Sequence, residues 1–72
     1  IMPKLREIRR YLRRSGWGMF RNTDHEYYTK VLPDGTTLYT KLSHGEGEIP
    51  PRVWKQMLKQ MGITQEDFNA GL

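Results

Sequence analysis

Residues 25–43, HEYYTKVLPDGTTLYTKLS, decide the fold of this 72-residue chain. Pro33-Asp34-Gly35 is a turn signal, because proline presets one φ angle and glycine accepts a positive one. After the turn, Leu38 and Leu42 alternate with polar side chains, a period of two that is typical of a strand with one covered face. The segment before the turn is rich in residue types that favour strands. We therefore predict an antiparallel hairpin with strands at residues 25–31 and 36–43.

A helix is expected on each side of this hairpin. Residues 4–15 place Leu5, Ile8 and Leu12 three or four positions apart, with Tyr11 beside them, which is the spacing of one helical face. Residues 52–61 follow two prolines and end before Gly62, a common helix stop. The apolar stripe of this second helix is Val53, Trp54, Met57, Leu58 and Met61.

Two shorter elements complete the order. Residues 17–22, WGMFRN, are short and aromatic and are assigned to a first strand. Thr64 and Asp67 have the spacing of a capping box, which predicts a short last helix that carries Phe68. The expected fold class is therefore α+β in the order α-β-β-β-α. A three-stranded antiparallel sheet has two helices on one face, a short C-terminal helix follows, and residues 1–72 form a single domain.

The alternation of strand side chains predicts which residues face the helices. His25, Tyr27 and Thr29 share one side of their strand. The pattern does not decide between Tyr27 and Tyr28, and we favour Tyr28 in the core, which leaves His25 on the open face. Leu38 and Leu42 should then point inward, and Tyr39 and Lys41 outward. Four further aromatic residues are expected in the core: Trp17, Phe20, Trp54 and Phe68.

Positive charge is concentrated in the first 21 residues. They hold seven Lys or Arg against one acid, Glu7, whereas residues 22–72 hold five basic and seven acidic residues. Such a patch attracts phosphate backbones without reading sequence, although a basic helix face also serves solubility alone. The candidate RNA-binding residues on the first helix are Arg6, Arg9, Arg10, Arg13 and Arg14.

Composition excludes several classes of protein. The chain has no cysteine, so disulfides and thiolate metal sites are absent, and only two histidines are present. Its apolar runs are shorter than the roughly 20 residues that a membrane-spanning helix needs. We expect a cytoplasmic protein that has no signal peptide and does not associate with a membrane.

Several segments together resemble the HicA family, the small messenger-RNA-cleaving toxins of HicAB toxin–antitoxin systems. They are LREIRRYLRRSGW, DHEYYTK and PDGTTLYTKLSHGEGEIPPRVWKQMLKQMGIT, with the TQEDF extension, and they cover roughly residues 5–68. The resemblance implies a fold of the double-stranded-RNA-binding-domain type, endoribonuclease activity towards mRNA, a HicB-like antitoxin partner and a catalytic histidine at His25. The chain departs from the family at Thr23-Asp24, where a Gly-Ser pair is usual, and at Glu26.

The residues supply the chemistry that this activity needs. His25 is the candidate base that takes the proton of the RNA 2′-hydroxyl, because the pKa of imidazole lies near 6.5. Lys41 or the first helix neutralises the phosphate, Tyr39 stacks on a base, and His44 or a tyrosine hydroxyl donates a proton. Asp24 is a possible secondary residue. No metal or other cofactor is required, and the alternation of Asp24, His25 and Glu26 between faces argues against a metal site.

Two other functions remain open at this point. A non-catalytic RNA-binding module of the same fold would use the arginines of the first helix and need no imidazole. A protein-interaction domain would present the same basic helix to an acidic partner.

Overall fold

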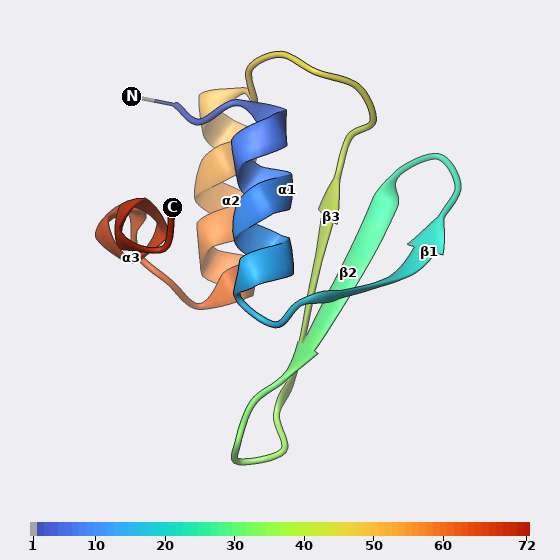
Figure 1. The fold of residues 1–72 in the computed structure, drawn as a ribbon, viewed down its shortest axis with the longest axis vertical. Helices are drawn as coiled ribbons and strands as arrows, with labels where there is room; N and C mark the ends of the chain where they lie inside the picture. The colour runs from blue at the N-terminus through green and yellow to red at the C-terminus, as the bar shows by residue number, and fades with distance from the viewer. Residues whose placement is uncertain (1) are drawn as a thin grey trace.

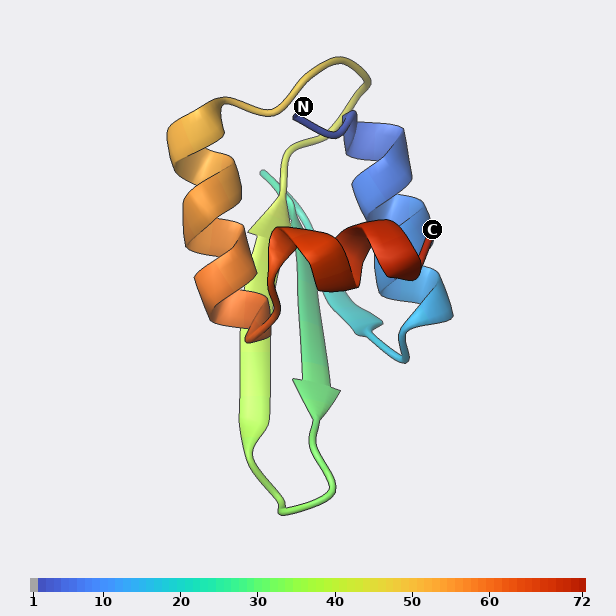
Figure 2. The same ribbon diagram turned by 90° about the vertical axis from the view of Figure 1, so that its left-hand side faces the viewer.

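A computed structural model describes residues 2–72 and has the expected α+β architecture (Figure 1). Helices α1 and α2 lie on one face of a three-stranded antiparallel sheet, and α3 lies on the outer side of both helices (Figure 2). Within residues 2–72, no helix covers the other face of the sheet. The elements are α1 (Leu5–Arg14), β1 (Gly18–Asn22), β2 (Glu26–Val31), β3 (Thr37–Leu42), α2 (Pro51–Met61) and α3 (Gln65–Ala70).

Strand β2 is the centre of the sheet, between β1 and β3. In the β2–β3 register Tyr27 lies opposite Lys41 and Tyr28 opposite Thr40. The turn closes where the amide of Leu32 donates to the carbonyl of Thr36 at 2.8 Å. Gly35 adopts a φ of 91°, which a side chain disfavours. The hairpin projects beyond the helical layer (Figure 1), so its turn is remote from the residues that precede β2.

The register of β1 against β2 is irregular between Met19 and Arg21. Such a bulge places one extra residue, here Phe20, in one strand and changes which side its neighbours face. Phe20 is 56% exposed, so the prediction that it belongs to the core is wrong. The physical reason is strand alternation, because Met19 lies opposite the buried Tyr28 and its neighbour Phe20 therefore faces the open side of the sheet.

The core lies between the sheet and the helices. Helix α1 contributes Leu5, Ile8, Tyr11 and Leu12, as expected from their spacing. Tyr28 is 4% exposed and Leu42 is 2% exposed, which confirms that this side of the hairpin faces the helices, with Leu38 partly buried against the same core. On α2, Trp54, Met57 and Met61 are buried and Leu58 is partly buried, but Val53 is 42% exposed and does not belong to the stripe as expected.

Helix α3 closes the outer side of the core. Thr64 and Asp67 form the expected capping box, with the Asp67 amide 3.1 Å from the Thr64 hydroxyl. Phe68 packs between the ring of Tyr11, at 4.9 Å, and the ring of Trp54, at 4.8 Å. One aromatic residue of α3 therefore joins the two larger helices.

The observed elements differ from the expected ranges only at their ends. Each strand is shorter than expected, and His25 lies one residue before β2. Trp17 is buried as expected but precedes β1, and α2 begins one residue early, at Pro51. No helix within residues 2–72 combines the length and the apolar character that crossing a bilayer demands.

Candidate functional site

A short turn between β1 and β2 positions His25. The amide of Thr23 donates to the carbonyl of His25 at 3.0 Å and closes the turn. The side chain of Asp24 secures it further, because its Oδ1 accepts from the Thr23 hydroxyl at 3.0 Å and from the Tyr27 hydroxyl at 2.9 Å. The Thr23-Asp24 pair therefore has a local role in holding the histidine, and a Gly-Ser pair would lack the carboxylate that accepts the two side-chain bonds.

The two nitrogens of the His25 ring have different surroundings. Nδ1 is buried and lies 3.3 Å from Oδ2 of Asp24, a contact that is close enough for an ion pair but not aligned as a hydrogen bond. Nε2 bonds to none of the residues 2–72. The side chain as a whole is 33% exposed. In the tautomer with its proton on Nδ1, this nitrogen faces the carboxylate and Nε2 is the nitrogen available to a ligand.

Asp24 is anionic beside this ring. Hydrogen bonds from Tyr27 and then Thr23, together with the nearby His25 ring, hold the pKa of Asp24 well below its usual value. The hydrogen bond between Tyr27 and Asp24 has the opposite effect on the phenol, because it raises the pKa of Tyr27 above 10.0. The turn thus places a fixed negative charge on the Nδ1 side of the imidazole.

The open face of the sheet carries an aromatic platform, which consists of Phe20, Tyr27 and Tyr39. Phe20 lies 6.2 Å from Tyr27 and 6.0 Å from Tyr39, measured between ring centroids. The His25 ring lies 6.3 Å from that of Tyr27. Tyr39 is 60% exposed, so the platform presents ring surface to solvent. Aromatic residues on an open sheet face are the surface on which sheet-based RNA-binding proteins stack unpaired bases.

Two cationic side chains accompany the platform. The guanidinium carbon of Arg21 lies 5.4 Å from the centre of the Tyr27 ring. Lys41 is paired with Tyr27 in the register and is exposed. Lys41 and Tyr39 were expected here. Phe20 and Arg21 were not assigned to this surface. Alternation along β1 could have placed Phe20, but only knowledge of the bulge would have placed Arg21.

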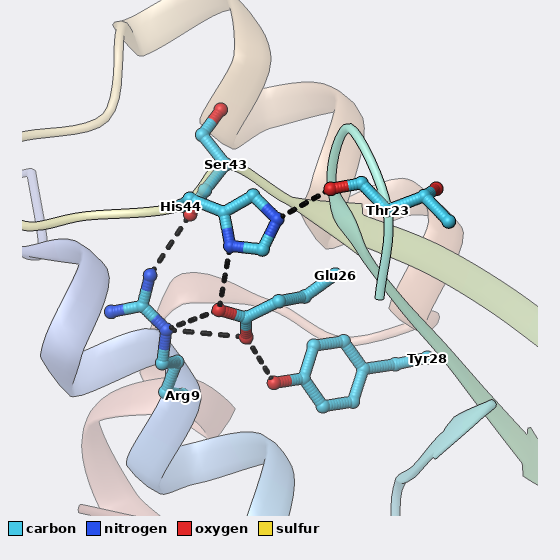
Figure 3. A network of polar contacts seen from close by, with 6 residues as sticks. All are labelled: Arg9, Thr23, Glu26, Tyr28, Ser43 and His44. Atoms are coloured by element: carbon cyan, nitrogen blue, oxygen red, sulfur yellow. Dashed lines mark hydrogen bonds and ion pairs between the residues drawn. The ribbon is translucent and has the colours of Figure 1, made fainter. Parts of the chain in front are cut away.

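The opposite side of β2 carries a different polar cluster, centred on Glu26 (Figure 3). Arg9 of α1 donates through Nε to both carboxylate oxygens of Glu26, at 3.2 and 3.0 Å, and through Nη2 to the carbonyl of Ser43 at 2.9 Å. The Tyr28 hydroxyl donates to Glu26 at 2.6 Å. These bonds join α1, the central strand and the end of β3.

His44 belongs to this cluster. Its Nε2 lies 2.9 Å from the carbonyl of Thr23 and its Nδ1 lies 3.7 Å from Oε2 of Glu26 (Figure 3). The carbonyl can only accept, so the contact requires a proton on Nε2. His44 therefore connects the loop after β3 to the turn that carries His25, and its own ring nitrogens are both engaged.

Charge and burial in the cluster shift the pKa values of its members. Burial alone would raise the pKa of Glu26, but hydrogen bonds from Tyr28 and Arg9 outweigh it and lower the pKa below its ordinary value of 4.5. Burial, and then the bond to Glu26, raise the pKa of Tyr28 to about 12. Glu26 is therefore a structural anion at neutral pH.

The predicted arginines of α1 lie apart from the platform, because α1 packs on the helical side of the sheet (Figure 2). Arg9 is occupied by Glu26, and Arg14 donates to the carbonyl of Leu72 at 3.0 Å. The remaining three, Arg6, Arg10 and Arg13, are exposed. The structure thus brings His25, Asp24, Tyr39 and Lys41 together on or beside the open face, and does not bring the helix arginines to them.

No family model, no curated protein and no solved structure matches this chain. Within residues 2–72, no group of three or more histidine, cysteine, aspartate or glutamate side chains is arranged to hold a metal ion.

Proposed function

We propose that this chain is a HicA-like toxin of the double-stranded-RNA-binding-domain type, a metal-independent endoribonuclease that cleaves mRNA in the cytoplasm with His25 as its base. One observation carries the proposal. A partly exposed imidazole stands beside an exposed aromatic sheet face, with its buried Nδ1 3.3 Å from an ionised carboxylate. That orientation leaves Nε2 for the substrate, as in other imidazole bases that a carboxylate orients.

RNA supplies the nucleophile for this reaction. Nε2 of His25 takes the proton of the 2′-hydroxyl, the 2′-oxygen forms a bond to phosphorus, and the bond to the 5′-oxygen breaks. The products are a 2′,3′-cyclic phosphate and a 5′-hydroxyl. Water protonates the leaving oxygen, because the other candidate donors, His44 and Tyr27, are held by their own partners.

Binding would use the open face. Bases of a single strand stack on Phe20, Tyr27 and Tyr39, and Arg21 and Lys41 lie close enough to contact phosphates. The exposed arginines of α1 would add affinity for a longer RNA from the other side of the molecule. A HicB-like antitoxin would inhibit the toxin by covering the platform and His25.

The two histidines supply a matched test. We expect His25→Ala to abolish cleavage of a single-stranded mRNA fragment in the presence of a chelator, because the base is lost. His44→Ala should keep most of the activity after correction for the folded fraction, measured by circular dichroism. Full cleavage by purified His25→Ala would refute the role of His25, and cleavage that stops on adding the chelator would refute the metal-independent reaction.

The alternative is a non-catalytic RNA-binding module of the same fold. It is favoured by Asp24, whose carboxylate repels an approaching phosphate, and by the imperfect alignment of its contact with Nδ1. Gel shifts that His25→Ala leaves unchanged, with intact RNA recovered from the wild-type complex, would establish this alternative.

A further inference from the structure

A cavity of about 410 Å³ lies next to His25, between the end of β3, the following loop and the first half of α2. This volume falls in the range of roughly 300–1,000 Å³ that is typical of ligand pockets. Its apolar lining includes Leu42, Ile49 and Met57, each of which is less than one-twentieth exposed. Its polar lining includes His25, Lys41, Glu48 and Gln56.

We propose that this cavity is a subsite for one unstacked nucleobase of the bound RNA, and that it selects bases with an exocyclic amino group. The inference rests on the RNA binding proposed above and extends it to base selection. A flat, largely apolar ring with polar edges matches an apolar cavity with a few polar groups, and enzymes that act on nucleic acids hold unstacked bases in this way.

The charge around the cavity favours a nucleotide over a purely apolar ligand. Lys41 lines it directly. Gln56 also lines an adjoining groove, which is formed with Pro51, Arg52, Lys55 and Lys59. Phosphates on either side of a bound nucleotide would therefore meet cations from β3 and from α2, while the base enters the cavity and brings its ribose near His25.

Glu48 and Gln56 supply the selectivity. A carboxylate only accepts hydrogen bonds at neutral pH, so Glu48 pairs with the amino group of adenine, cytosine or guanine and repels the carbonyl oxygens of uracil. The amide of Gln56 both donates and accepts, and it completes the contacts along the edge of the base. We therefore expect uracil to bind most weakly.

The test uses short single-stranded RNA that carries 2′-O-methyl groups and cannot be cleaved, with one abasic site moved along the strand. At one position the abasic site should lower wild-type affinity roughly tenfold, the effect of losing one well-packed base. Val53→Trp fills the cavity and should remove that sensitivity. Val31→Trp, a matched change at the far end of β2 where the side chain is 64% exposed, should keep it. The subsite would be overturned if the abasic site lowered affinity equally at all positions, or if Val53→Trp kept the sensitivity to its position.

The same position tests selectivity. Uracil there should bind several-fold more weakly than adenine, and Glu48→Gln should narrow the difference. An unchanged preference in Glu48→Gln would refute the role of the carboxylate.

Adenosine monophosphate tests the cavity independently of RNA cleavage and of any variant's folding. Added to the labelled wild-type protein, it should shift the methyl resonances of Ile49 and Met57 more than those of Leu72. If those methyls shift and no RNA is cut, the nuclease proposal fails and the subsite stands. If RNA is cut and those methyls do not respond, the subsite fails and the nuclease proposal stands.

Discussion

The two faces of strand β2 use similar residue types for different purposes. On the helical face Tyr28 is buried and its hydroxyl donates to Glu26, an anion that is already paired with Arg9. On the open face Tyr27 donates to Asp24, an anion on the protein surface, and Nε2 of the adjacent His25 has no hydrogen-bond partner among residues 2–72. The comparison teaches that the polar groups of the helical face stabilise the fold, whereas those of the open face remain available to a ligand.

The largest expected difference between the faces is in stability. Tyr28→Ala removes a buried ring and one partner of a partly buried anion, and should lower the free energy of unfolding by about 3–5 kcal/mol. Tyr27→Ala should cost about 1 kcal/mol or less, because its site is only half-buried. Chemical denaturation of both variants checks the contrast, and equal losses would contradict the assignment of the two faces. Tyr27→Ala should instead weaken RNA binding.

Glu26→Gln should have a smaller effect. It should lower the free energy of unfolding by about 2 kcal/mol at neutral pH, because the charge-assisted bonds from Arg9 and Tyr28 weaken. The pKa of Glu26 is lowered in the folded protein, so its contribution is present above its ordinary value of 4.5 and is lost as the pH falls through the lower folded value. The stability difference between wild type and variant should therefore shrink in acid. Denaturation curves from neutral pH to below pH 4 measure it, and a difference that grows in acid would contradict this sign.

The smallest effect concerns the open face alone. Asp24→Asn removes the carboxylate that raises the pKa of Tyr27, so this phenol should titrate closer to 10.0 than in the wild type. Nuclear magnetic resonance of labelled tyrosine rings follows the titration residue by residue. Asp34→Asn, a change at another exposed turn aspartate, is the control and should leave Tyr27 unaltered. If the pKa of Tyr27 is the same in Asp24→Asn as in the wild type, the hydrogen bond between Tyr27 and Asp24 is absent in solution.

Much of the fold could be predicted from sequence, because the local patterns of apolar residues match the side chains that are buried in the core. The period of two in β3, the helical spacing of Leu5, Ile8 and Leu12, and the capping box at Thr64 each have one simple physical cause. The choice of Tyr28 for the core of β2 is confirmed, although the pattern alone did not decide between Tyr27 and Tyr28.

The remaining errors come from features that no local pattern encodes. A bulge in β1 turns Arg21 to the side of Tyr27, and a bulge leaves no clear signature in five residues. The Arg9–Glu26 pair joins residues 17 positions apart, so charge counting placed Arg9 with the exposed arginines. Similarly, the contact of His44 with Thr23 spans 21 positions and depends on how the loop after β3 returns to the sheet.

The packing of Phe68 between Tyr11 and Trp54 affects how the chain folds during synthesis. Tyr11 on α1 is synthesised well before Phe68, the residue whose ring joins α1 to α2. The core therefore stays incomplete, and its apolar surface accessible to chaperones, until translation has passed residue 68.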